Sequence, residues 1–166
     1  MGQNKENKIL ELYYEYPNKA FAVRAISKKT RIPKSTVQKY LQELKKQNFI
    51  TKDNKAGTSL LFKTKKVNYY IEKLVSSGLI EHLLEELNPS CIILFGSIRK
   101  GDSINESDID LFVESSVKKE PNVDKYEKNM KHTIQLFIEN NINDLQPHLF
   151  NNVVNGIKLL GSFSIK

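Results

Sequence analysis

Gly96, Ser97, Asp108 and Asp110 combine residue types and a spacing that suit the chemistry of phosphates and metal ions. Gly96 has no Cβ, so the backbone N–H groups around it are open to a phosphate, and Ser97 adds a hydroxyl. If Asp108 and Asp110 lie on a strand, both carboxylates share one face, roughly 7 Å apart along the strand. Such carboxylates repel each other unless a cation lies between them, and oxygen ligands favour a hard divalent ion such as Mg²⁺. These residues predict phosphoryl or nucleotidyl transfer.

The residues around this motif predict two strands that hold it. Residues 92–95 form a short apolar run, which is typical of a buried strand. Ile109, Leu111 and Val113 recur at every second position, which is the period of a strand. We therefore expect the Gly-Ser pair to end one strand and the two aspartates to enter the next, with a turn and a polar loop between them.

The spacing of these residues resembles a known family signature. The pair Gly96-Ser97, the ten residues that follow and then Asp108-Ile109-Asp110 resemble the GS-x10-D-x-D motif of the DNA polymerase beta nucleotidyltransferase superfamily. The loop is similar to that of the small prokaryotic branch, the minimal nucleotidyltransferases, at Arg99, Gly101, Asp102 and Ser107. Together with the closing stretch NNVVNGIKLLG, the resemblance spans about residues 79–162.

The resemblance implies a domain that uses Mg²⁺ and a nucleoside triphosphate, with ATP expected. Asp108 and Asp110 would be the catalytic residues and the metal ligands. The nucleotide-binding residues would be Gly96, Ser97, Arg99 and Lys100, of which the two cations would offset charge that develops on the phosphates. The acceptor stays open, since family members modify small molecules or protein side chains. A partner protein of a toxin–antitoxin type pair is one candidate acceptor.

One position departs from the family pattern. Family members usually supply a third acidic residue from a third strand, here expected over residues 133–138, but this sequence has Gln135 in that place. An amide coordinates through its carbonyl but cannot accept a proton at neutral pH. Glu139, which would share a strand face with Gln135, or Asp144 could substitute for it. His132 flanks this strand, where it would act as a base or, as we expect, lie at the surface.

Composition and charge separate the chain into two parts. Residues 1–75 hold 17 basic against 6 acidic residues, a net charge of +11, whereas residues 76–166 hold 9 against 13, a net charge of −4. A basic part of this kind is a candidate for nucleic-acid binding. The single cysteine, Cys91, cannot form an internal disulfide, and no apolar segment reaches the length of a membrane span. We therefore expect a cytoplasmic protein without a membrane partner.

The basic part resembles a winged helix-turn-helix domain over about residues 5–66. Apolar spacing predicts helices over residues 4–16, 21–29 and from Pro33 onward, and strands at 49–50 and 59–62. The third helix would enter the major groove of double-stranded DNA, and lysines of the wing would contact phosphates. The predicted DNA-binding residues are Lys34, Ser35, Thr36, Gln38, Lys39, Lys52 and Lys55. The alternative is a module for protein interaction or dimerisation.

Residues 65–87 show a long helical pattern that is expected to break near Gly78. The predicted fold class is therefore α+β, with a winged helix-turn-helix domain (1–66), a linker helix (67–78) and a small mixed-sheet α/β nucleotidyltransferase domain (79–166). Apolar residues on the linker helix would suit a homodimer contact.

Two functions follow from these patterns. The leading hypothesis is a DNA-binding protein that transfers a nucleoside monophosphate from a nucleoside triphosphate to an unknown acceptor. The alternative, motivated by Gln135, is a transcriptional regulator that has lost catalysis and uses the nucleotidyltransferase fold to sense a ligand or a partner. An antibiotic-modifying nucleotidyltransferase is less expected, because no helical substrate domain follows in this sequence.

Overall fold

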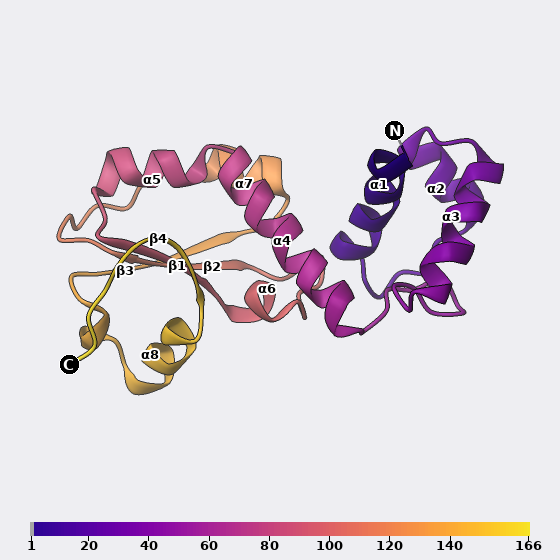
Figure 1. Cartoon of the computed structure of the whole chain (residues 1–166). Coiled ribbons are helices and arrows are strands. Elements are labelled where there is room, and N and C mark those ends of the chain that lie inside the picture. The colour runs from indigo at the N-terminus through magenta and orange to yellow at the C-terminus, as the bar shows by residue number, and fades with distance from the viewer. Residues whose placement is uncertain (1) are drawn as a thin grey trace. The chain divides into compact units, whose positions relative to one another are not determined.

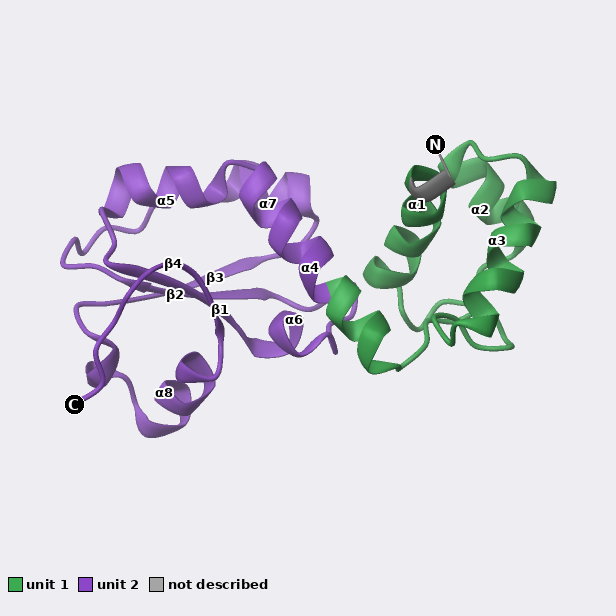
Figure 2. Ribbon diagram, viewed as in Figure 1, with its two compact units in different colours: residues 1–66 green, residues 67–166 purple. Residues whose placement is uncertain are grey.

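The structure is a computed structural model that describes residues 2–166, with side chains described from Asn4 onward (Figure 1). The chain forms two compact units, one ending at Lys66 and one beginning at Val67 (Figure 2). The boundary lies inside a helix, α4 (Leu60–Ser76). Within residues 2–166, no helix combines the length and apolar character that crossing a membrane requires.

The second unit is built on a four-stranded mixed sheet with the strand order β3-β2-β1-β4. Its strands are β1 (Cys91–Phe95), β2 (Ile109–Glu114), β3 (Ile134–Glu139) and β4 (Ile157–Gly161). β1 pairs antiparallel with both β2 and β4, whereas β2 pairs parallel with β3. The predicted α+β class with a mixed sheet is confirmed for this unit.

Helices cover both faces of this sheet, as Figure 1 shows. One face carries α5 (Leu79–Leu87), α7 (Asp124–Met130) and the part of α4 that contains Tyr70 and Leu74. The other face carries α8 (Pro147–Val154) and the short 3-10 helix η1 (Ile142–Asp144). Because both faces are covered, β1 is buried along its whole length, including the thiol of Cys91.

The first unit packs three helices against a tight hairpin. The helices are α1 (Gly2–Glu15), α2 (Val23–Thr30) and α3 (Lys34–Lys46). The hairpin closes through the bridge between Ile50 and Ala56, and Ala56 N donates to Pro17 O over 3.1 Å. The apolar stripe of α3 enters the core through Val37, Leu41 and Leu44.

The second wing strand, predicted over residues 59–62, is wrong because α4 begins at Leu60. Ser59 Oγ accepts a hydrogen bond from Phe62 N over 3.3 Å, as at the start of a helix. Phe62 is buried, whereas Leu60 is 81% exposed, so these two residues do not share a face as they would in a strand.

The predicted helix break near Gly78 is confirmed, since α4 ends at Ser76 and α5 begins at Leu79. Gly78 has a φ of +80°, a left-handed conformation that glycine adopts without strain. The residues predicted to form a linker helix thus form the end of α4, and Tyr70 and Leu74 there belong to the core of the second unit.

Candidate functional site

The closest approach in the site is between the backbone of Gly96 and the carboxylate of Asp110. β1 and β2 pair so that Phe95 lies opposite Asp110, and the chain turns at the next residue, Gly96. A Cβ on Gly96 would lie 1.9 Å from Asp110 Oδ2, and Gly96 also has a φ of +72°. Any other residue would have to displace the carboxylate and would strain the backbone. The sheet therefore brings the Gly-Ser motif and an aspartate together.

The Gly-Ser pair opens a short helix, α6 (Gly96–Lys100), where a turn was expected. Ile98 is buried and fixes this helix against the core, and Gly101 ends it in a left-handed conformation. The Ser97 hydroxyl has no hydrogen-bond partner among residues 2–166. Arg99 is half-buried and Lys100 is exposed. Ser97 and both cations thus belong to one element that begins at the end of β1.

Asp108 immediately precedes β2, and its carboxylate is held by β3. Gln135 lies opposite Asp110 in the parallel pairing of β2 with β3, and Gln135 Nε2 donates to Asp108 Oδ2 over 2.7 Å. The predicted pair of aspartates and Gln135 thus lie at the same end of the sheet. Gln135 fixes the orientation of Asp108 without adding a negative charge.

Neither proposed substitute acid lies beside the aspartates. Glu139 is opposite Glu114, four residues further along β3, which is about 13 Å from Gln135. Its carboxylate forms an ion pair with Lys118 over 3.1 Å. Asp144 lies in η1, on a different element. Within residues 2–166, no group of three or more His, Cys, Asp or Glu side chains could hold a metal ion together.

The electrostatics of the two aspartates favour a bound cation. Desolvation by burial, followed by the charge of Asp108, raises the pKa of Asp110 above its ordinary value. A divalent cation would relieve both effects, and carboxylate oxygens are ligands that Mg²⁺ prefers. Two carboxylates are too few to enclose Mg²⁺, but they suit an ion that also takes oxygens from phosphates and water. The residues present therefore fit one Mg²⁺ carried with a nucleotide.

A buried histidine supports the loop that carries Asp108. His132 is 7% exposed, and its Nδ1 lies 2.7 Å from Ser107 O while its Nε2 lies 3.2 Å from the Tyr70 hydroxyl of α4. Because Ser107 O can only accept, Nδ1 donates to it, and a second hydrogen bond joins Nε2 to the tyrosine hydroxyl. The expected surface position of His132 is therefore wrong. Its partner Tyr70 lies 62 residues earlier, so no local pattern could reveal this contact.

The predicted DNA-binding residues lie on α3 and on the hairpin of the first unit. Lys34, Ser35, Gln38 and Lys39 are exposed along α3, while Thr36 is half-buried. On the hairpin, Lys52 and Lys55 are exposed. Lys45 Nζ donates to Lys52 O over 3.1 Å, which ties the hairpin to α3. The predicted residues therefore lie on two elements of this unit that are joined by a hydrogen bond.

A shallow groove of about 490 Å³ also runs along α3. It adds an acidic residue to the face that was predicted to meet DNA, since its lining residues are Ser35, Thr36, Lys39, Tyr40 and Glu43.

Comparison with known families identifies the family of the second unit. The sequence matches the family model of the polymerase beta nucleotidyltransferase domain over residues 78–162, about half of the chain. The chain therefore belongs to the polymerase beta nucleotidyltransferase family. The matched range contains the whole sheet, the Gly-Ser motif and both aspartates. No curated protein and no solved structure matches the chain. The winged helix-turn-helix assignment of the first unit stays a prediction.

Proposed function

We propose that the second unit transfers a nucleoside monophosphate from a nucleoside triphosphate to an acceptor hydroxyl. The observation that carries this proposal is the convergence of Gly96, Ser97, Asp108 and Asp110 at one end of the sheet. The backbone at Gly96 and the Ser97 hydroxyl would bind phosphate oxygens. Arg99 and Lys100 would offset the charge on the leaving pyrophosphate.

Asp108 and Asp110 would hold Mg²⁺ together with the triphosphate. When bound, the ion would supply positive charge that offsets the negative charge of the triphosphate and of the leaving pyrophosphate. Gln135 keeps one carboxylate oxygen of Asp108 hydrogen-bonded, and this orients the other oxygen. The half-buried position of Asp110 lowers the competition of bulk water for its carboxylate.

The acceptor must lose its proton without help from a third carboxylate. The Gln135 amide cannot accept a proton at neutral pH, and Glu139 is engaged by Lys118. The acceptor oxygen would attack the α-phosphorus, pyrophosphate would leave, and the proton would go to water or to a base that the acceptor itself supplies. A hydroxyl on a partner protein, with a basic side chain next to it, meets this requirement. A toxin–antitoxin type pair is one setting for such a partner.

A calorimetric titration tests this proposal. Each nucleoside triphosphate would be titrated with and without Mg²⁺ into the natural protein and into Asp108→Ala combined with Asp110→Ala. We expect binding that depends on Mg²⁺ and is lost in this double variant. The matched control is Glu81→Ala with Glu85→Ala, which removes the same two charges from exposed positions of α5. Equal binding in both double variants would refute the assignment of the site.

The alternative is a regulator whose nucleotidyltransferase fold senses a ligand or a partner without catalysis. The specific observation in its favour is the hydrogen bond from Gln135 to Asp108. It occupies one carboxylate oxygen of Asp108, and with Gln135 in place of an acid the site has two carboxylates and no third. In this proposal the first unit binds double-stranded DNA through α3 and the hairpin. Duplex binding with no incorporation of labelled nucleotide into any protein fraction would favour the regulator. Incorporation that needs Asp110 would exclude it.

A further inference from the structure

The outer edge of β3 offers backbone groups that the sheet does not use. β3 is an edge strand, paired in parallel with β2 alone. Ile109 N donates to Thr133 O over 2.8 Å, and Ser115 N donates to Glu139 O over 2.9 Å. In a parallel pair of strands, the backbone groups of successive residues point alternately toward and away from the partner strand. The N–H and C=O groups of the odd-numbered residues of β3 therefore point toward β2, and those of the even-numbered residues point away from it.

Two residues therefore present free donors and acceptors at this edge. Ile134 N is occupied, since it donates to Glu127 Oε1 over 2.8 Å. For Leu136 and Ile138, no residue from 2 to 166 pairs with the backbone N–H or C=O. An edge with such groups at strand spacing is a template for a further strand.

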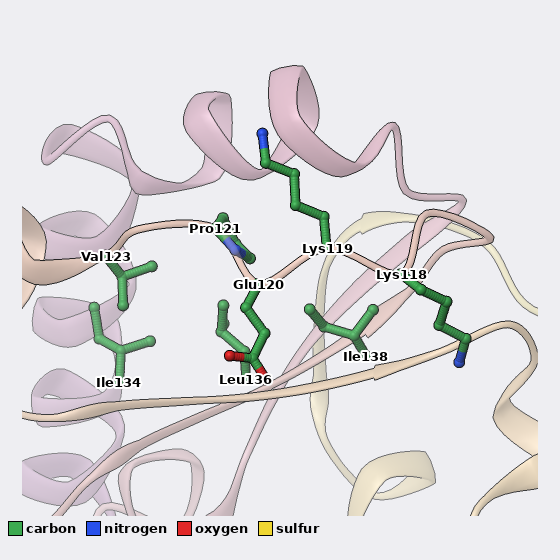
Figure 3. A pocket seen from close by; sticks show the side chains of 8 residues that line it. All are labelled: Lys118, Lys119, Glu120, Pro121, Val123, Ile134, Leu136 and Ile138. Carbon is green, nitrogen blue, oxygen red and sulfur yellow. The ribbon is translucent and has the colours of Figure 1, made fainter.

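A groove of about 520 Å³ lies directly beside this edge (Figure 3). Its floor is apolar and consists of the side chains of Ile134, Leu136 and Ile138. Its other wall is residues 118–121 and Val123, which run alongside β3 in Figure 3. The side chains of the floor point to the face of the sheet opposite to that of Gln135, so the groove is separate from the two aspartates.

The charges around the groove favour a basic occupant. Lys118 forms an ion pair with Glu139 over 3.1 Å, and Lys119 forms a short ion pair with Glu86, so both lysines are neutralised by acidic partners. Glu120 has no such partner among residues 2–166, and Figure 3 shows its carboxylate directed into the groove. Counting both lysines, their two glutamate partners and Glu120, the charged side chains around the groove carry a net charge of −1 above an apolar floor.

We propose that this edge and groove bind an extended segment of a partner protein, which adds a strand to β3. The backbone of that segment would pair with Leu136 and Ile138, which a compact small molecule could not do at both positions. Every second side chain would be apolar and contact the floor, and one Lys or Arg on the same face would meet Glu120. This binding does not depend on nucleotide transfer, because it uses the other face of the sheet.

Selection from a library of random eight-residue peptides displayed on phage, with the full chain as bait, tests the proposal. We expect enriched peptides with apolar residues at alternating positions and one Lys or Arg on the apolar face. Against Glu120→Lys, the same peptides should bind about five- to tenfold more weakly, because attraction becomes repulsion. The matched control is Glu85→Lys, an equal charge change on α5 outside the groove, which should leave the affinity unchanged.

Hydrogen exchange locates the bound peptide. Binding should slow exchange at the amides of Leu136 and Ile138 and leave the amide of Ile134 unchanged, since Glu127 already protects it. The proposal is overturned if no peptide slows exchange at Leu136 and Ile138, or if Glu120→Lys and Glu85→Lys bind the peptides equally. The proposal is also overturned if sedimentation shows a dimer and hydrogen exchange shows that the dimer protects these same two amides. That result would assign the edge to a second copy of the chain.

Discussion

At the scale of single residues, the contact between Gly96 and Asp110 is the most restrictive feature of the site. Gly96→Ala places a methyl group on the carboxylate and forces alanine into a left-handed conformation, which alone costs about 1–2 kcal/mol. Gly78→Ala is the matched control, because Gly78 also has a positive φ but a methyl group there would meet no atom within 4 Å. We expect Gly96→Ala to lose more stability in urea denaturation and to lose nucleotide binding. Equal losses and intact binding would contradict this.

The raised pKa of Asp110 makes the stability of the second unit depend on pH. The folded protein holds this proton more tightly than the unfolded chain, because of burial and the charge of Asp108. The free energy of unfolding therefore falls as pH rises from the unfolded pKa, about 3.9, through the higher folded pKa. At pH values above the folded pKa, the protonation of Asp110 no longer contributes to the free energy of unfolding.

Asp110→Asn removes this ionisation. We expect it to raise the melting temperature in metal-free buffer at pH 7. Near pH 3 we expect no such gain, because the Asp110 side chain of the natural protein is then protonated and as neutral as asparagine. Differential scanning calorimetry at the two pH values measures the difference. A melting temperature at pH 7 that is unchanged or lower would show that the Asp110 charge is already compensated in the folded state.

At the scale of elements, the His132 contacts join α4, the loop before β2 and the start of β3. His132→Ala leaves the partly buried Ser107 carbonyl without its donor, which costs about 1–3 kcal/mol, and releases the residue next to Asp108. We expect both stability and nucleotide affinity to fall. His132→Asn, whose amide can still donate to the carbonyl, should restore part of the affinity. Unchanged nucleotide affinity in His132→Ala would limit this residue to a structural role.

The start of α4 gives a second test at this scale. Phe62 is 2% exposed and its ring lies 5.2 Å from that of Tyr14, so Phe62→Ala should cost about 3–5 kcal/mol in urea denaturation. Leu60→Ala is the control, since Leu60 is exposed in the helix and its loss should cost about 0.5 kcal/mol or less. A strand over residues 59–62 would place both side chains on one face. Comparable losses in the two variants would therefore favour the strand.

The elements that could be predicted well from the sequence are those with clear apolar patterns. β1, β2, β3 and the break near Gly78 are of this kind, because burial produces apolar runs or regular alternation. Residues 59–62 were misassigned because a short apolar run fits a strand and a helix equally. α6 has five residues and no period of its own. The positions of His132 and Glu139 depended on strand register and on contacts between distant segments, which no local pattern contains.

At the scale of the whole molecule, the separation of charge predicts that the basic part of the chain binds nucleic acid. Because residues 1–75 carry a net charge of +11, we expect them to bind duplex DNA. The logarithm of the association constant should then fall linearly with the logarithm of the salt concentration. Lys34→Glu with Lys39→Glu should reduce that slope by about 2 if each lysine contacts one phosphate. Fluorescence anisotropy at several salt concentrations measures the slope.

The control for this prediction is Lys125→Glu with Lys128→Glu, which makes the same charge change on α7 of the second unit. If both double variants change the slope equally, binding reflects overall charge and not the surface formed by α3 and the hairpin. A slope that neither pair changes would leave the first unit as a module for protein interaction.

The burial of Cys91 makes its alkylation rate a natural probe of local unfolding in the second unit. Desolvation, followed by the charge of Glu114, raises the pKa of this thiol to about 11, so almost no reactive thiolate exists near neutral pH. The chain has no other cysteine. An alkylating reagent would therefore modify the native protein only when β1 separates from its neighbours. The rate of mass increase would time the opening of this unit alone, with no probe added and no signal from the first unit.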